Sequence, residues 1–251
     1  MKRQKFRRLL LLISLLLFPV TLYYLSPVLI LQGGFSGIVT GSFLTFAALF
    51  LFSLLFGRAF CGWLCPSGGL QECCLPIVDK KVAGKRIDYV KYVLWVPWLV
   101  CIVLGFLRAG GIQRIDVFYM TDHGLSVSGV AGYVVYLSVI TLITVLALTL
   151  GRRGMCHSVC WMAPFMVLGT KLKDRLGYPS LHLEADAERC VQCGLCSKRC
   201  PMGLDVAEMV RTVQMQNSEC ILCGSCADHC GKGAVRFAFR HSRQLLGQQR
   251  K

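Results

Sequence analysis

The chain has 251 residues, 55% of them hydrophobic, and a formal net charge of +15. High apolarity and high charge are compatible when they occupy different parts of a chain, and residues 9–57 contain no Lys, Arg, Asp or Glu. The basic residues lie beside apolar segments rather than in a stripe with interleaved aromatic residues, which argues against nucleic-acid binding. We therefore expect a membrane part in the first half and a soluble module after residue 151.

Four apolar segments are long enough to cross a bilayer core of roughly 30 Å, which takes about 20 helical residues. They are residues 9–31, 35–55, 89–107 and 130–150. Pro19, Pro27 and Pro97 fall within them, and helices packed in a membrane tolerate such prolines. The first segment is longer than the apolar core of a signal peptide, so we interpret it as an uncleaved anchor.

Lys and Arg are distributed unequally among the connections, and they favour the cytoplasmic side of a membrane. The N-terminal tail, the connection between the second and third segments and the residues after the fourth are rich in them: Lys2, Arg3, Lys5, Arg7, Arg8, Arg58, Lys80, Lys81, Lys85, Arg86, Arg152 and Arg153. The connection at residues 108–129 carries only Arg108 and Arg114, and the first connection carries neither Lys nor Arg. We predict a multi-pass protein of the inner (cytoplasmic) membrane, with both termini and all cysteine clusters on the cytoplasmic side.

Two four-cysteine runs follow the apolar half. Residues 190–201 read CVQCGLCSKRCP and residues 220–230 read CILCGSCADHC, each with the spacing C-x-x-C-x-x-C-x-x-x-C. This spacing binds [4Fe–4S] clusters in bacterial ferredoxins, where the fourth cysteine of each run ligates the other cluster. Two zinc sites are the alternative, but zinc usually takes pairs of C-x-x-C motifs. We predict one cluster on Cys190, Cys193, Cys196 and Cys230, and a second on Cys200, Cys220, Cys223 and Cys226.

Two short segments flank these runs and alternate apolar with polar residues, SLHLEAD at 180–186 and AVRFAFR at 234–240. We expect them to pair as antiparallel strands that close the module. The predicted fold class is an α-helical membrane protein with four transmembrane helices and a C-terminal α+β ferredoxin module. Its expected parts are a membrane domain (1–165), a linker with the first ferredoxin strand (166–189), the two-cluster module (190–240) and a basic tail (241–251).

A second kind of cysteine pair ends two of the apolar segments. FCGWLCP at 60–66 and GMCHSVCWMAPF at 154–165 each contain C-x-x-x-C shortly after Gly-Arg, which indicates an internal repeat. The pairs are Cys61 with Cys65 and Cys156 with Cys160, and we expect them to lie side by side beneath the docked ferredoxin. Three roles remain open: a further metal centre, redox-active dithiols, or structural packing.

Together these features resemble the NapH/NosR-type membrane-bound 4Fe–4S ferredoxins (polyferredoxins) and, more distantly, the CcoG-type copper-reducing assembly factors. FCGWLCPSGGLQE carries most of this resemblance, whereas in the second copy Trp161 follows Cys160 and the proline is delayed to Pro164. The resemblance implies an electron-transfer subunit of an oxidoreductase system rather than a stand-alone enzyme.

We therefore predict a membrane-anchored iron–sulfur protein that passes electrons between a quinone/quinol or cytoplasmic donor and a partner oxidoreductase. One alternative is a thiol- or metal-reducing assembly factor, since copper(I) prefers thiolate ligands. Another is a redox-sensing regulatory membrane protein. The outer loop gathers proton acceptors of the kind a quinone site needs, and a polar loop that packs on a partner subunit is the alternative there. These residues are Asp116, Tyr119, Asp122 and His123.

Overall fold

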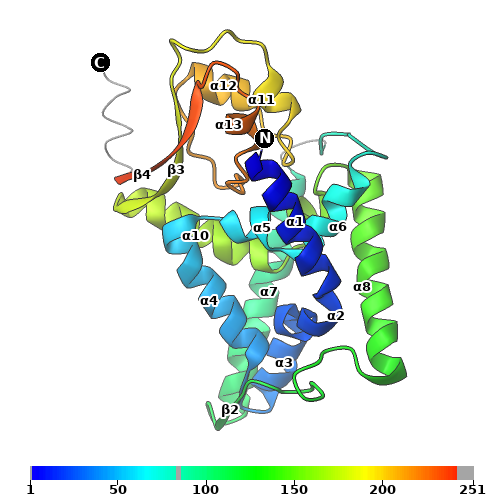
Figure 1. Ribbon diagram of the computed structural model, residues 1–251. Helices are drawn as coiled ribbons and strands as arrows, with labels where there is room; N and C mark the ends of the chain where they lie inside the picture. Colours follow the sequence, from blue (N-terminus) through cyan, green and yellow to red (C-terminus); the bar gives the residue numbers. More distant parts are fainter. Residues whose placement is uncertain (1, 83–85, 242–251) are drawn as a thin grey trace.

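A computed structural model describes residues 2–82 and 86–241, and it divides the molecule into a helical body and a small α+β module (Figure 1). The module holds strands β3 and β4 with three short helices at one end of the body. The body contains α1 (Lys2–Leu16), α2 (Phe18–Thr21), a 3-10 helix η1 (Tyr23–Leu25), α3 (Pro27–Phe35), β1 (Ile38–Thr40), α4 (Gly41–Phe56), α5 (Ala59–Trp63), α6 (Pro66–Cys74), α7 (Ile87–Arg108), β2 (Arg114–Asp116), α8 (Gly129–Leu150), α9 (Gly154–Ser158) and α10 (Met162–Leu176).

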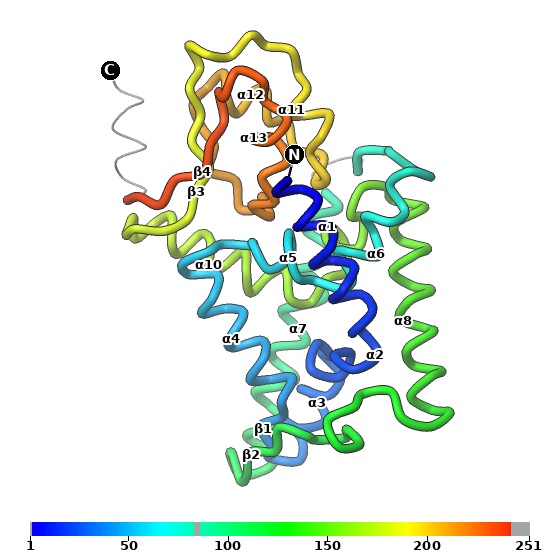
Figure 2. The backbone as a smooth tube through the Cα atoms, viewed as in Figure 1, coloured from blue at the N-terminus to red at the C-terminus, as the bar shows by residue number. Residues whose placement is uncertain are grey.

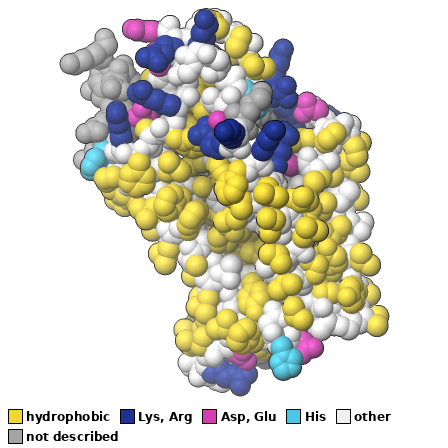
Figure 3. All heavy atoms as spheres, viewed as in Figure 1, with side chains coloured by type: hydrophobic (Ala, Val, Ile, Leu, Met, Phe, Trp, Pro, Cys, Tyr) yellow, Lys and Arg dark blue, Asp and Glu magenta, His cyan; other side chains and the backbone are white. Residues whose placement is uncertain are grey.

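Two helices of the body, α7 and α8, have 22 residues each and are long and apolar enough to cross a membrane. They contain the predicted third and fourth spans. Many of their large apolar side chains, such as Val93, Leu107 and Val130, are exposed, as expected for a surface that lipid covers. Figure 3 shows a broad hydrophobic band on the surface of the body, with charged residues gathered at its two ends.

The other two predicted spans differ from continuous membrane helices. The segment 9–31 is divided among α1, α2, η1 and α3, and the breaks fall near Pro19 and at Pro27. Proline has no backbone N–H and clashes with the preceding turn, so the helix restarts with each proline in a first turn. The second predicted span corresponds to α4, an apolar helix of 16 residues. Hydropathy alone therefore predicted longer helices in residues 9–55 than the structure contains.

The body is held together by helix pairs distant in sequence: α10 packs along α4, α3 along α7, and α1 along α6 (Figure 2). The contact between α10 and α4 differs from the prediction for residues 166–189, which is a linker with the first ferredoxin strand. Gly169 makes it possible: a Cβ at this position would collide with Ser53 Oγ. The start of the predicted linker is therefore part of the packed body.

The module is closed by an antiparallel pair of strands, β3 (Pro179–Ala185) and β4 (Val235–His241), with register from Pro179 opposite His241 to Ala185 opposite Val235. The strands predicted from the alternating pattern are thus confirmed. Between them lie α11 (Leu195–Lys198), α12 (Val206–Arg211) and α13 (Ser225–Asp228). Except for His241, the predicted basic tail lies outside the described residues.

Candidate metal centres

The first predicted ligand set lines one cavity of the module. Its volume is about 310 Å³, and its wall includes Cys190, Cys193, Cys196 and Cys230. The first three come from one run, and the fourth comes from the other run. Cys193 is exposed and the remaining three are partly buried. Four cysteine sulfurs around one cavity form the donor set that a [4Fe–4S] cluster requires, so the residues fit this group.

The second predicted set lines a tighter cavity of about 20 Å³, whose wall includes Cys200, Cys220, Cys223 and Cys226. The other side chains of its wall are apolar and include Leu183, Met202, Val206, Met215 and Ile221. Burial raises the pKa of Cys220 to about 12 and that of Cys223 to about 11. A metal that binds here must therefore displace protons from the thiols. The donor set again matches a [4Fe–4S] cluster, in a far less accessible position than the first.

Both cysteine loops have the same unusual backbone. Gln192 and Leu222 have φ of 54° and 47°, and two residues later Gly194 and Gly224 have φ of 69° and 70°. A positive φ is uncommon for side chains such as Gln and Leu. Turns of this kind direct successive N–H groups into a concavity that suits anions, including the sulfides of iron–sulfur sites. The repeated backbone is consistent with one type of ligand in both loops.

The C-x-x-x-C pairs occupy matching positions in the body. Each pair follows a glycine of positive φ at the end of a long helix. Gly57 (φ 54°) follows α4, and Gly151 (φ 97°) follows α8. The first pair lies in and just after α5, and the second lies in and just after α9. All four thiols are buried; Cys61 and Cys156 share one cluster of buried side chains, and Cys65 and Cys160 share another. The structure thus brings together the two halves of the repeat.

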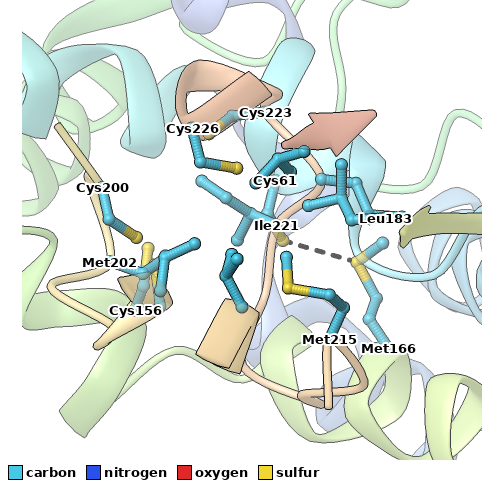
Figure 4. Close-up of a cluster of buried hydrophobic side chains, with 14 residues drawn as sticks. Cys61, Cys156, Met166, Leu183, Cys200, Met202, Met215, Ile221, Cys223 and Cys226 are labelled. Atoms are coloured by element: carbon cyan, nitrogen blue, oxygen red, sulfur yellow. Dashed lines mark hydrogen bonds between the residues drawn. The ribbon is translucent and has the colours of Figure 1, made fainter. Parts of the chain in front are cut away.

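This four-thiol site adjoins the buried ferredoxin site. Cys61 and Cys156 belong to the same cluster of buried side chains as Cys200, Cys223 and Cys226 (Figure 4). Cys61 Sγ lies 3.5 Å from Met166 Sδ of α10, the dashed contact in Figure 4. Burial raises the pKa of Cys61 and Cys65, and raises that of Cys160 to about 12. As free thiols, these groups are therefore neutral.

Buried ion pairs surround the four-thiol site, and sequence reasoning missed them. Glu72 accepts hydrogen bonds from Arg7 and Arg153, and Glu219 accepts from Arg58 and Lys91. The four cations are at most 3% exposed. From the sequence, both Arg58 and Arg153 indicate the cytoplasmic side, and Arg58 is also a neighbour that could lower the pKa of a thiol in the first pair; their burial against carboxylates was not predicted. Their position directly beside the cysteine pairs was the available signal for a second role.

Side chains of the body bind the carbonyl oxygens of both buried cysteine loops. Trp63 Nε1 donates to Leu222 O at 3.0 Å, and Gln4 Nε2 donates to Cys223 O at 2.9 Å. In the other loop, Arg152 Nη1 donates to Cys200 O at 3.1 Å. The expected docking of the module on the C-x-x-x-C surface is therefore present, and it fixes the loops that carry the buried set.

The outer loop lies at the opposite end of the body, beside β2 (Figure 1). Asp116 accepts a hydrogen bond from the Phe118 N–H, and Asp122 lies 3.8 Å from His123. Tyr119 is partly buried, whereas the side chain of His123 is 98% exposed. The quinone or partner role of this loop stays a prediction.

Comparison with known domains agrees with this arrangement. Residues 182–231 match a 4Fe–4S dicluster domain, and residues 38–83 and 131–179 both match one 4Fe–4S binding domain. The chain therefore contains ferredoxin-type iron–sulfur domains. Each of the two segments that match the 4Fe–4S binding domain includes one C-x-x-x-C pair.

Three relatives are similar over much of the chain. An uncharacterized protein, MJ0749 of Methanocaldococcus jannaschii, is 27% identical over 76% of this chain and 71% of its own length. The putative electron transport protein YccM of Escherichia coli is 25% identical over 74% of this chain and 53% of its own. The methylamine utilization ferredoxin-type protein MauN of Methylorubrum extorquens is 28% identical over 70% of this chain and 59% of its own. This chain thus spans little more than half of YccM and MauN. No solved structure matches the chain.

Proposed function

We propose that this chain is a membrane-anchored iron–sulfur protein that carries electrons between a quinone/quinol or cytoplasmic donor and a partner oxidoreductase. The observation that supports it best is the sorting of eight cysteines into two cavities, each with three thiols from one run and the fourth from the other. Such a crossed pattern is typical of two-cluster ferredoxins. The names of YccM and MauN agree with this class.

We assign different tasks to the two sites. Cys190, Cys193, Cys196 and Cys230 would hold the cluster that faces solvent, where a soluble redox partner can approach Cys193. Cys200, Cys220, Cys223 and Cys226 would hold the cluster that faces the body, and apolar side chains exclude water from it. When bound, such clusters supply one-electron redox chemistry. The path would then run from the exposed site through the buried one to the four thiols at the membrane surface.

Anchoring in the membrane is supported by α7 and α8 and by the hydrophobic band of Figure 3. We propose that the lipid-embedded part also includes α4 and the broken first segment, which gives a four-span body. The asymmetry of Lys and Arg supports a cytoplasmic module in a NapH/NosR-like arrangement.

The matched variants Cys230→Ser and Cys200→Ser test the ligand sets. Full-length protein purified without oxygen is expected to contain about eight iron atoms and as many labile sulfides in its ferredoxin module. Cys230→Ser should perturb the electron paramagnetic resonance signal of the exposed cluster, and Cys200→Ser that of the buried cluster. Zinc in place of iron, or identical damage by both variants to one cluster, would contradict the proposal.

A second candidate function, reduction of copper for metalloenzyme assembly, is supported by the buried thiols of Cys61 and Cys65 beside the buried ferredoxin site. Copper(I) prefers such soft ligands. Reduced protein should then convert copper(II) to copper(I), one electron per ion, and Cys61→Ser with Cys65→Ser should abolish this conversion while the ferredoxin signals persist. Equal conversion by the variant would remove this candidate.

A further inference from the structure

A cavity of about 240 Å³ lies where the helical body meets the docked module. Its wall on the body side comes from α1, from α6 with the residues that follow it, and from Arg152. Its wall on the module side comes from residues 198–201, Ser225 and His229. Because a water molecule takes about 30 Å³ of liquid volume, the cavity has room for roughly eight waters. It can therefore accept a small polyatomic group, and it depends on the contact between the two parts.

Positive charge dominates the wall of this cavity. Five Lys or Arg side chains line it: Arg7, Arg8, Arg152, Lys198 and Arg199. Among the described residues, the same wall has two carboxylates, Glu72 and Asp79, and these pair with Arg7 and Arg152. The other three cations make no side-chain hydrogen bond or ion pair within the part of the chain that the structure describes. Like charges around one cavity repel one another, and an anion between them removes this repulsion.

The buried side of the wall also presents a directed donor. Arg152 is 8% exposed, its Nε binds Asp79 and its Nη1 binds Cys200 O. Its Nη2 has no hydrogen bond among the described residues. Arg8, Lys198 and Arg199 are exposed, so their side chains can close around a ligand. A fixed guanidinium with further cations beside it is the arrangement that recognises the oxygens of a phosphate group.

The cavity adjoins the apolar surface of the body. Arg8 directly precedes residues 9–57, which carry no charge, and Leu9 and Leu12 of the same helix are exposed. Leu75 and Pro76 add apolar atoms to the wall itself. If the body spans the membrane as proposed, the headgroups of the cytoplasmic leaflet lie at this level. Basic pockets in this position bind the headgroups of anionic lipids.

We propose that this cavity binds a phosphate group, held by Arg8, Lys198 and Arg199 together with Arg152 Nη2. The group belongs either to an anionic phospholipid or to a small soluble phosphate. Its oxygens accept charge-assisted hydrogen bonds, and its negative charge offsets the three unpaired cations. The site has no part in electron transfer, so the proposal goes beyond the proposed function. Because both parts of the molecule line the cavity, the bound group also joins the module to the body.

Binding to the full-length protein, purified in nonionic detergent without phosphate buffer, tests the proposal in two arms. In the first, native mass spectrometry compares retention of phosphatidylglycerol with that of phosphatidylcholine, which has no net charge. In the second, calorimetry measures the binding of inorganic phosphate and of diphosphate. Preferential retention of phosphatidylglycerol would identify a lipid headgroup, and calorimetric binding would identify a soluble phosphate. Binding in neither arm would overturn the proposal.

The variant with Arg8→Gln, Lys198→Gln and Arg199→Gln tests the location of the site. Each cation near a membrane surface strengthens anion binding about fivefold, so the three changes together should weaken it roughly 100-fold. The altered side chains are exposed and unpaired, so the thermal unfolding midpoint and both ferredoxin signals should persist. Arg8→Gln alone should give about a fivefold loss, which keeps the test decisive if the triple variant is unstable.

A matched control removes the same charge elsewhere. Lys171→Gln, Arg175→Gln and Arg211→Gln alter three exposed cations that do not line the cavity. This control should bind the ligand as tightly as the unaltered protein. Equal weakening by the two triple variants would show that net charge alone attracts the ligand, and it would overturn the assignment of the site.

Discussion

Glu219 joins the two parts of the molecule at a single carboxylate. It lies immediately before Cys220, and it binds Arg58 of the first C-x-x-x-C segment and Lys91 of α7 at 2.5 and 2.7 Å. Burial raises the pKa of Glu219, but the two cations outweigh this effect and lower the pKa to about 2. The carboxylate is therefore ionised throughout the physiological range, and both buried cations depend on it.

Glu219→Gln should destabilise the protein by about 3–5 kcal/mol, because it leaves buried positive charge without its partner. The thermal unfolding midpoint in detergent measures this loss. The stabilisation by Glu219 is fully present above its ordinary pKa of 4.5 and is lost as the pH falls through about 2. The deficit should thus be constant between pH 5 and 8. Glu208→Gln, which removes an exposed partner of Arg211, is the control and should not change the midpoint. A strongly pH-dependent deficit in this range would contradict the assigned pairing.

At the scale of elements, α5 touches the buried cysteine loop through a glycine. A Cβ at Gly62 would collide with the carbonyl oxygen of Ile221, which is backbone and cannot move aside as a flexible side chain would. Trp63, the next residue, binds the same loop. The short helix that carries Cys61 is thus in direct backbone contact with the buried ferredoxin site.

Gly62→Ala should therefore separate the module from the body. We expect faster proteolytic release of the module, with iron retained in the exposed site. Gly231→Ala is a matched control in the module, because a Cβ there would meet nothing within 4 Å. Release at the same rate from both variants would show that close contact at Gly62 is not required for docking.

The sequence predicted those elements whose determinants are local. The spacing of the cysteine runs predicted the two ligand groups, and the alternation in two short segments predicted β3 and β4. Hydropathy could not show that Pro19 and Pro27 divide the first apolar segment. Hydropathy also could not distinguish an exposed arginine from a buried one such as Arg58 or Arg153. Their burial depends on carboxylates that distant parts of the chain contribute.

At the scale of the whole molecule, the hydrophobic band separates the module from the outer loop (Figure 3). If the body spans the membrane as proposed, these two ends face different compartments. Reporter fusions at the C-terminus and at Gly124 should give opposite results: a fluorescent protein active at the C-terminus and a periplasmic alkaline phosphatase active at Gly124. Phosphatase activity at both positions, or at neither, would contradict the proposed topology.

The contact between α1 and the second cysteine loop has a consequence for biogenesis. Gln4 donates hydrogen bonds to Cys223 O and to the Asp228 carboxylate. Gln4 and Cys223 are 219 positions apart in the sequence. At ribosomal rates of about 5–20 residues per second, roughly 10–45 s separate the synthesis of these partners. Once α1 docks, it helps to cover the loop that holds Cys223. Because α1 is synthesised long before Cys223, it is already available when this loop is made, and cofactor delivery to the site competes with closure by α1.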